Sequence, residues 1–392
     1  MNRTDDIAQK MRILLSLFKR ELERVFMGLI ILMALWSCSK EQDEPEPEPV
    51  VQEVISFSGS LQEATEVTAG TRAESTTPLS DIVQAFNVWA FKNTAINNPG
   101  NGDPINYTAY QTVINNYTVN WTENSANTTV TNSSGWEYVD GSDQSIKYWD
   151  FDAKAYKFFG ITGNNEESQT EPYWAYTVSG ANAVLSINNV DASNPTAAPY
   201  VSRLWFSNNS YVSSDSKYYG MPVKLEFIKP FAQVRFMFTK AEGVNVNLDE
   251  DISEQEFKPA TEGRKIAMKG SVAISYPLTG TATKESWTST PTGYWEDVDH
   301  NPVFFTQDFR TGQETWYTVL PISGQGAFRL VATVQGEEMS ATVPAEFMEW
   351  HPGYSYTYIF KITREGGIEF DVVQVAIKNW EDRDVKHHVY NW

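Results

Sequence analysis

The sequence predicts an all-β protein with two tandem β-sandwich domains of Greek-key type, placed after an N-terminal export segment and a short spacer. Three observations lead to this fold class. Short runs that alternate apolar and polar residues, as half-buried strands do, recur over most of the 392 residues. Polar loops rich in Gly, Pro, Asn and Asp separate these runs. No segment after Cys38 carries apolar residues at helical spacing.

Residues 1–37 are predicted to be a signal peptide. Residues 25–36 form a run of 12 apolar residues, preceded by Lys19, Arg20 and Arg24. A basic region, a short apolar region and a small residue before the cut are typical of secretory signals. At ~1.5 Å per residue the run covers ~18 Å, less than the ~30 Å of a bilayer core. The segment is therefore expected to direct export and not to span a membrane.

Cys38 is the only cysteine of the chain, and it follows the predicted signal peptide directly. Residues 35–38, LWSC, resemble the bacterial lipobox, whose cysteine is acylated and becomes the new N-terminus. The alternative is an ordinary signal peptide followed by a chance cysteine. A lone cysteine in an exported chain calls for an explanation, and a lipid attached to Cys38 supplies one. The lipid of the outer membrane is therefore an expected partner.

Residues 38–50 form a spacer between the lipid and the folded chain. Acidic residues begin at Glu41, and this resembles the export tag that moves some Gram-negative lipoproteins to the outer face of the cell. Pro45, Pro47 and Pro49 then alternate with glutamates. Proline favours an extended helix and the glutamates repel one another, so the spacer is stiff. The expected location is the cell outer membrane, exposed at the surface.

The charge of the exported chain excludes one class of function. From residue 38 onward there are 24 basic and 46 acidic residues, a net charge of −22. Such a field repels nucleic acid, so nucleic-acid binding is excluded. The remaining length of ~350 residues suits two domains at ~150 residues each.

The N-terminal domain is placed at residues 51–220. Its first strand is expected to end at Gly59, with Val51, Ile55 and Phe57 directed into the core. Residues 81–93, DIVQAFNVWAFKN, are apolar on both faces, with Ile82 beginning one of them, which predicts a strand covered on both sides. Residues 93–106 contain turn-forming residues and are expected to be a surface loop.

The C-terminal domain is placed at residues 221–392, because the strand rhythm restarts at Val223 after a polar segment. Residues 265–278 are expected to form two short strands around Gly270, and residues 279–302 a long loop. Residues 327–347 carry the signature of a β-hairpin. Residues 222–380 are therefore expected to fold on their own.

No enzyme is expected. The four histidines form no HExxH motif, and the chain has no GxSxG elbow or phosphate-binding loop. The carboxylates at 249–251 and at 296–299 lie in loops, where solvated turns are more common than a glycosidase pair. Calcium at Asp297 and Asp299, or at Asp140 and Asp143, is an alternative whose spacing matches no EF-hand. The prediction is no catalytic residue, no metal and no cofactor.

A surface glycan is the partner in a second functional hypothesis. Trp136 and Tyr138, or Tyr173 and Trp174, lie near Asn-rich loops and would stack on sugar rings in a lectin-like domain that does not polymerise. Aromatic side chains in a β-sandwich more often belong to the core.

Five segments resemble the fimbrillin family, the type V pilins of Gram-negative bacteria. They are YWDFDAKAYKFFG (148–160), LEFIKPFAQVRF (225–236), TVLPISGQGAFRLVATVQG (318–336), EWHPGYSYTYIFKI (349–362) and VQVAIKNW (373–380). The resemblance implies two β-sandwich domains, export as a lipoprotein and a structural role in a cell-surface pilus that serves adhesion. It also implies cleavage by an arginine-specific protease, and the matching bond joins Arg72 to Ala73. Cleavage would release the first strand, and another fimbrial subunit would replace it with a donor strand.

The C-terminal residues 381–392 are the candidate donor strand of this chain. Val385 and Val389 share one face, and Tyr390 and Trp392 share the other. This is a small apolar set for a donor strand. The alternatives are a frayed C-terminus, or a tip or anchor subunit that needs no donor, so the sequence leaves stalk, tip and anchor roles open.

Overall fold

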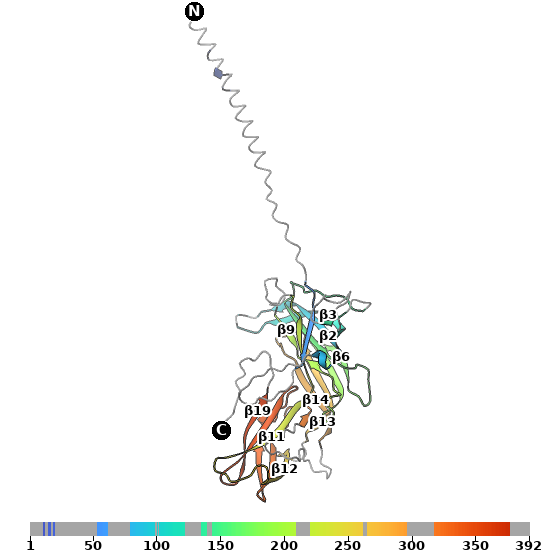
Figure 1. The fold of residues 1–392 in the computed structure, drawn as a ribbon. Helices are drawn as coiled ribbons and strands as arrows, with labels where there is room; N and C mark the ends of the chain where they lie inside the picture. The colour runs from blue at the N-terminus through green and yellow to red at the C-terminus, as the bar shows by residue number, and fades with distance from the viewer. Residues whose placement is uncertain are drawn as a thin grey trace, which may run out of the picture. The chain divides into compact units, whose positions relative to one another are not determined.

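The computed structural model describes residues 53–61, 79–98, 100, 102–121, 135–138, 143–208, 220–261, 265–295 and 317–376, together with residues 11, 15, 16 and 19 (Figure 1). The chain forms two compact units, Met1–Gln52 and Glu53–Trp392. In the second unit the described residues form strands β1 to β19 and the short 3-10 helices η1 (Leu79–Asp81) and η2 (Ala345–Phe347). No helix within the described ranges is long and apolar enough to cross a membrane. The all-β prediction is confirmed.

The first sheet closes on itself. Its strand order is β2-β3-β4-β1-β10-β8-β5-β9, and an additional pairing of β2 with β5 completes the ring. Its strands are β1 (Phe57–Leu61), β2 (Ala85–Asn97), β3 (Asn106–Trp121), β4 (Trp136–Glu137), β5 (Ala155–Ile161), β8 (Val201–Ser202), β9 (Trp205–Ser207) and β10 (Val223–Ile228). Buried side chains such as Phe57, Phe86 and Phe158 form one core cluster in this sheet. We call this sheet the closed sheet.

A second sheet has the strand order β14-β13-β7-β6. Its strands are β6 (Tyr173–Ser179), β7 (Asn182–Asp191), β13 (Ala267–Pro277) and β14 (Ser286–Tyr294). It shares a second core cluster with the closed sheet, in which the rings of Phe159 and Tyr276 stack at 4.0 Å. In β2, Phe86 and Val88 enter the first cluster, whereas Trp89 and Phe91 enter the second. The predicted strand with two apolar faces is thus confirmed, because core surrounds it on both sides.

Two further sheets pack as a sandwich. One has the order β15-β11-β18-β19 and the other β12-β16-β17. Their strands are β11 (Ala232–Lys240), β12 (Ile252–Pro259), β15 (Tyr317–Val319), β16 (Phe328–Val334), β17 (Glu337–Val343), β18 (Ser355–Ile362) and β19 (Ile368–Ala376). Phe236, Phe257 and Tyr358 lie in the third core cluster, with the rings of Phe236 and Phe257 4.4 Å apart. The predicted hairpin at 327–347 is confirmed as β16 and β17.

The sheets do not divide at the predicted boundary between residues 220 and 221. β10 pairs with β1 and β8, and β13 pairs with β7, so three strands from the second half of the chain (β10, β13 and β14) belong to sheets of the first half. The sheets change between Ile228, where β10 ends, and Ala232, where β11 begins. A strand rhythm is local and does not identify the partner strand, which is why a boundary placed from rhythm alone misses this exchange.

Four expectations about shorter segments need correction. Ile82 lies outside β2 and is 42% exposed. The surface loop expected at 93–106 is shorter, because β2 continues to Asn97. Residues 265–278 contain one strand, β13, with an irregular register at Gly270. The loop expected at 279–302 contains β14, an edge strand rich in Ser and Thr residues, whose hydroxyl side chains suit a partly exposed sheet.

Candidate functional site

The candidate site is the position of the first strand in the closed sheet. We call residues 53–61 the first-strand segment. Ile55, Phe57 and Leu61 alternate along it, and all three side chains are buried. The expectation that Ile55 and Phe57 fill the core agrees with this placement. The strand was expected to end at Gly59, but β1 continues to Leu61. Val51 lies outside the residues that the structure describes.

Aromatic rings surround Phe57 on the inner side of the closed sheet. Its ring centroid lies 6.2 Å from that of Phe86, 5.9 Å from Tyr138 and 6.0 Å from Phe158. Full burial of an Ile, Leu or Phe side chain is worth about 1.5–3 kcal/mol, so the three buried side chains of the segment contribute about 5–9 kcal/mol as an upper estimate.

Main-chain pairing holds the C-terminal half of the segment. β1 runs parallel to β10, from Phe57 opposite Val223 to Leu61 opposite Phe227. The amide of Val223 also donates to the carbonyl oxygen of Ser56 at 2.8 Å. On the other side, Phe57 lies opposite Trp136 of β4. The segment is therefore an internal member of the sheet, and its loss would leave β10 with an unpaired edge.

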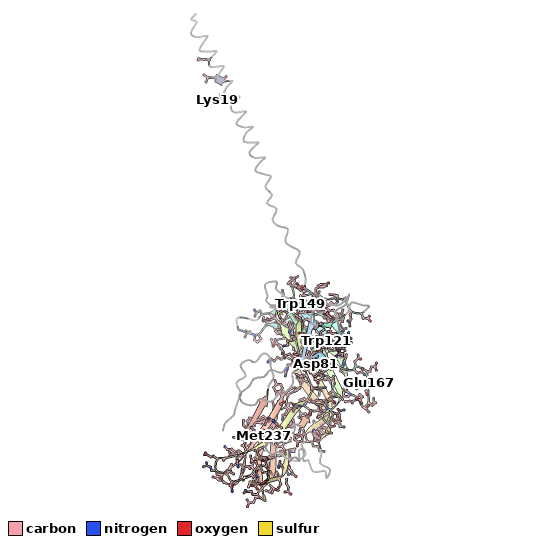
Figure 2. The ribbon with its side chains drawn as sticks, in the orientation of Figure 1. Lys19, Asp81, Trp121, Trp149, Glu167 and Met237 are labelled. Atoms are coloured by element: carbon pink, nitrogen blue, oxygen red, sulfur yellow. The ribbon has the colours of Figure 1, made fainter. Side chains whose placement is uncertain are left out.

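The N-terminal half pairs with residues 147–149. The amide of Ile55 donates to Lys147 O at 2.8 Å, and the amide of Trp149 donates to Glu53 O at 3.0 Å. The hydroxyl of Tyr138 donates to Ile55 O at 3.0 Å and accepts from the amide of Lys147 at 3.1 Å. Burial raises the pKa of Tyr138, so the hydroxyl keeps its proton and remains a donor. Trp149 is buried (labelled in Figure 2).

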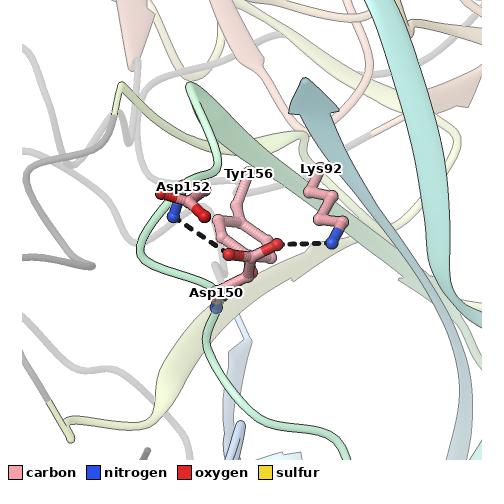
Figure 3. A network of polar contacts seen from close by, with 4 residues as sticks. All are labelled: Lys92, Asp150, Asp152 and Tyr156. Atoms are coloured by element: carbon pink, nitrogen blue, oxygen red, sulfur yellow. Dashed lines mark hydrogen bonds and ion pairs between the residues drawn. The ribbon is translucent and has the colours of Figure 1, made fainter. Parts of the chain in front are cut away.

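A polar network fixes the turn that follows Trp149 (Figure 3). The ammonium of Lys92 pairs with Oδ2 of Asp150, and Oδ1 of Asp150 accepts from the amide of Asp152 at 2.9 Å. The amide of Asp150 donates to the hydroxyl of Tyr156 at 2.7 Å. The hydrogen bond from Lys92 holds the pKa of Asp150 below its ordinary value. Asp150, which directly follows residues 147–149, is thereby tied to β2 and β5 without help from the first-strand segment.

Leu79 of η1 packs on the first-strand segment. It is fully buried, and a β-carbon placed on Gly59 would lie 2.7 Å from Leu79 Cδ2. Sequence reasoning missed Leu79. The available signal was the single glycine inside the alternation of Ile55, Phe57 and Leu61, since glycine within a strand often marks the close approach of another group.

Most other predicted site residues lie outside the residues that the structure describes. These are Cys38 for lipidation, Arg72 and Ala73 for cleavage, and Val385, Val389, Tyr390 and Trp392 of the tail. They remain predictions.

The aromatic residues considered for sugar stacking are mostly buried. Trp136 and Tyr138 belong to the core cluster of the first-strand site, and Trp174 belongs to the cluster shared with the second sheet. Tyr173 alone is partly exposed. The sugar-platform hypothesis is therefore wrong for three of its four residues. Across the described part of the chain, no three His, Cys, Asp or Glu side chains are grouped to hold a metal ion.

Comparison with known proteins agrees with the resemblance seen in the sequence. Two similar solved structures are a fimbrial protein from Bacteroides vulgatus and a fimbrial assembly protein from Parabacteroides distasonis. The first is 12% identical, with a TM-score of 0.36 over 84% of this chain and 99% of that one. The second is 9% identical, with a TM-score of 0.33 over 82% and 98%. No curated protein matches the chain. A family model described as fimbrillin-like matches residues 71–380, and the chain belongs to the fimbrillin-like family.

Proposed function

We propose that this chain is a structural, non-catalytic subunit of a cell-surface fimbria that serves adhesion. In this proposal Cys38 is acylated, and the precursor is held at the outer membrane. An arginine-specific protease cuts between Arg72 and Ala73. The first-strand segment then leaves, and a strand from another fimbrial subunit takes its place.

The observation that supports strand exchange is the position of β1 in the closed sheet. The segment provides three buried apolar side chains and pairs with β10, yet it lies on the N-terminal side of Arg72. A cut at Arg72 would separate it covalently from all the strands that surround it. Its departure would expose an apolar groove and unpaired main-chain groups, which an incoming strand satisfies by main-chain pairing and alternate side chains. Contacts of this head-to-tail kind do not close and so build filaments.

Cleavage and exchange are tested together on three purified precursors: wild type, Arg72→Ala and Arg72→Lys. Each is treated with an arginine-specific protease and, separately, with trypsin. A fluorescent peptide of residues 51–61 is then added, and its comigration with the protein on a sizing column is measured. Wild type should capture the peptide after either protease, Arg72→Lys only after trypsin, and Arg72→Ala after neither. N-terminal sequencing should find Ala73 wherever capture occurs.

Capture of the peptide by treated Arg72→Ala would contradict cleavage at Arg72 as the trigger. Absence of capture by every cut protein would contradict strand exchange at this site.

The segment that this chain would offer to a neighbouring subunit is the tail, residues 381–392. Deletion of residues 384–392 removes Val385, Val389, Tyr390 and Trp392. It should leave peptide capture by the chain unchanged, while it reduces the incorporation of the next subunit into fimbriae on cells. Unchanged fimbriae would favour a tip or anchor role, which needs no donor tail.

A further inference from the structure

Gly59 has no room for a side chain, because Leu79 occupies the space beside it. A β-carbon at position 59 would lie 2.7 Å from Leu79 Cδ2 and 3.3 Å from Leu79 Cβ. Rotation of Leu79 would move Cδ2 away but would leave its Cβ in place. Phe57 and Leu61 lie two residues on either side and are buried in the same core cluster, so position 59 faces the interior too. Leu79 therefore fills the place that a side chain at position 59 would take.

Leu79 is held by the part of the chain that stays after cleavage. Its carbonyl oxygen accepts from the amides of Ile82 and Val83, both at 3.0 Å. Gln84 Nε2 donates to Ser80 O at 2.9 Å, and the amide of Trp121 donates to Gln84 O at 2.8 Å. These bonds connect η1 to β2 and β3 without any contribution from β1. The main chain of Leu79 is thus held independently of the first-strand segment.

Building on the proposed function, we infer that Leu79 selects the strand that enters the first-strand site. An acceptable strand has glycine where Gly59 lies. It has large apolar residues at the places of Ile55, Phe57 and Leu61. In sequence terms the incoming segment has the form apolar-x-apolar-x-Gly-x-apolar.

This requirement excludes the tail of a second copy, residues 381–392, as the strand that enters the site. The tail, residues 381–392, contains no glycine. If the alternate residues from Val385 to Asn391 took the places of residues 55, 57, 59 and 61, Val389 would lie at the place of Gly59. If the alternate residues from Lys386 to Trp392 took these places instead, Tyr390 would lie there. The tail of one copy therefore does not fit the site of another while Leu79 is in place.

The test measures peptide affinity for the full chain cut behind Arg72. Four fluorescent peptides are compared by anisotropy: residues 51–61, the same peptide with Gly59→Val, the same peptide with Ser60→Val, and residues 381–392. Valine favours strands more than glycine does, so propensity alone would make the Gly59→Val peptide bind better. We expect it to bind at least about tenfold more weakly, because overpacking a filled site is costly. The Ser60→Val control changes the other face and should bind within about twofold of the parent.

One further measurement assigns the effect to Leu79. In the cut Leu79→Ala chain, the penalty for the Gly59→Val peptide should shrink by at least about threefold, because the 2.7 Å contact with Cδ2 is removed while the 3.3 Å contact with Cβ remains. The tail peptide should show no saturable binding to the wild-type cut chain.

Equal affinities of the parent and Gly59→Val peptides for the wild-type chain would overturn selection by Leu79 and leave strand exchange standing. Saturable tail binding close to that of the parent peptide would overturn the conclusion that the tail of a second copy is excluded from the site. If none of the four peptides binds the cut chain, strand exchange itself fails, and selection by Leu79 falls with it.

Discussion

The ammonium group of Lys157 donates a hydrogen bond of 2.7 Å to the main-chain carbonyl oxygen of Pro277. Lys157 lies on β5 of the closed sheet and Pro277 ends β13, 120 residues later. Its side chain has no exposed surface, and the rings of Tyr107 and Phe206 lie 5.2 and 5.9 Å from its Nζ. Beside it, Asn93 Nδ2 donates to Leu278 O at 2.8 Å. Two buried polar side chains of the first half thus bind adjacent carbonyls of the second half.

Stability should rise with pH between about 8 and 10. Burial lowers the pKa of Lys157 from 10.5 to about 8, so in this window the unfolded chain binds a proton that the folded chain does not. Because the unfolded state then binds more protons, unfolding becomes less favourable as pH rises, by ~3 kcal/mol at most from this group. Lys229 has a pKa lowered to about 8 by the same cause and adds in the same direction. Urea unfolding at several pH values measures the effect.

Lys157→Met is the variant that isolates this contribution, and the exposed Lys154→Met is its control. Lys157→Met should reduce the rise of the free energy of unfolding between pH 8 and 10, whereas Lys154→Met should leave this rise unchanged. Above pH 10 the trend should reverse, because unfolded tyrosines ionise while burial raises the pKa of Tyr276 and Tyr358 in the folded chain. An equal slope in wild type and Lys157→Met between pH 8 and 10 would contradict this prediction.

Asp150→Asn should weaken the network beside the first-strand site. It removes the charge that pairs with Lys92 but keeps an oxygen for the amide of Asp152. The pair is partly exposed, with side-chain exposures of 21% and 35%, so the loss at pH 7 should be about 0.5–1 kcal/mol. Wild-type stability should also fall as pH drops below about 4, because Asp150, whose pKa is lowered by Lys92, then becomes protonated.

The exposed Asp152→Asn is the matched control for the same urea titrations. Its stability should follow that of the wild type across the acid range. The interpretation fails if the stability of Asp150→Asn falls below pH 4 as steeply as that of the wild type.

Phe57→Ala should destabilise the precursor by about 3–5 kcal/mol. The change opens a cavity between Phe86, Tyr138 and Phe158, and buried Phe→Ala changes typically cost this amount. The control is Ser58→Ala, a partly exposed neighbour on β1, which should stay within about 0.5 kcal/mol of wild type. Chemical unfolding followed by tryptophan fluorescence measures both. Similar effects of the two changes would mean that β1 contributes little to the core.

Cys38→Ala should release the precursor from the membrane fraction, because acylation of Cys38 is the anchor that the sequence predicts. A single acyl chain binds membranes only marginally, so stable attachment depends on the full lipid modification of this cysteine. Fractionation of cells, followed by detection of the precursor, measures it, and Ser39→Ala is the neighbouring control. Retention of Cys38→Ala in the outer membrane at the wild-type level would exclude this anchor.

The strands themselves were largely predictable, because alternation is local. The pattern around Phe86 and Trp89 predicted a strand covered on both sides, and β2 is covered in this way. Strand partners were not predictable. β10 and β11 have the same rhythm and are separated by three residues, yet they belong to different sheets.

The first-strand site was predictable in part. The burial of Ile55 and Phe57 follows from their alternation. The role of Leu79 does not, because its short 3-10 helix lies outside any strand pattern and meets Gly59 only through the tertiary fold.

Residues 222–380 should not fold into a cooperative domain, although their strand rhythm suggests that they would. In this fragment β10 loses both of its partners, β1 and β8, and β13 loses β7. The buried side chains of Leu225, Phe227 and Tyr276 would then face solvent. Exposed apolar faces and unpaired edges favour aggregation over a unique fold.

The matched control is the chain from residue 53 to 380, which retains these partners. Circular dichroism and sizing should show a sharp melt and a monomer for the control, and a broad melt or aggregates for the fragment. A sharp, reversible melt of monomeric 222–380 would contradict this prediction. It would show that the sandwich of β11, β12 and β15–β19 folds although β10 lacks β1 and β8 and β13 lacks β7.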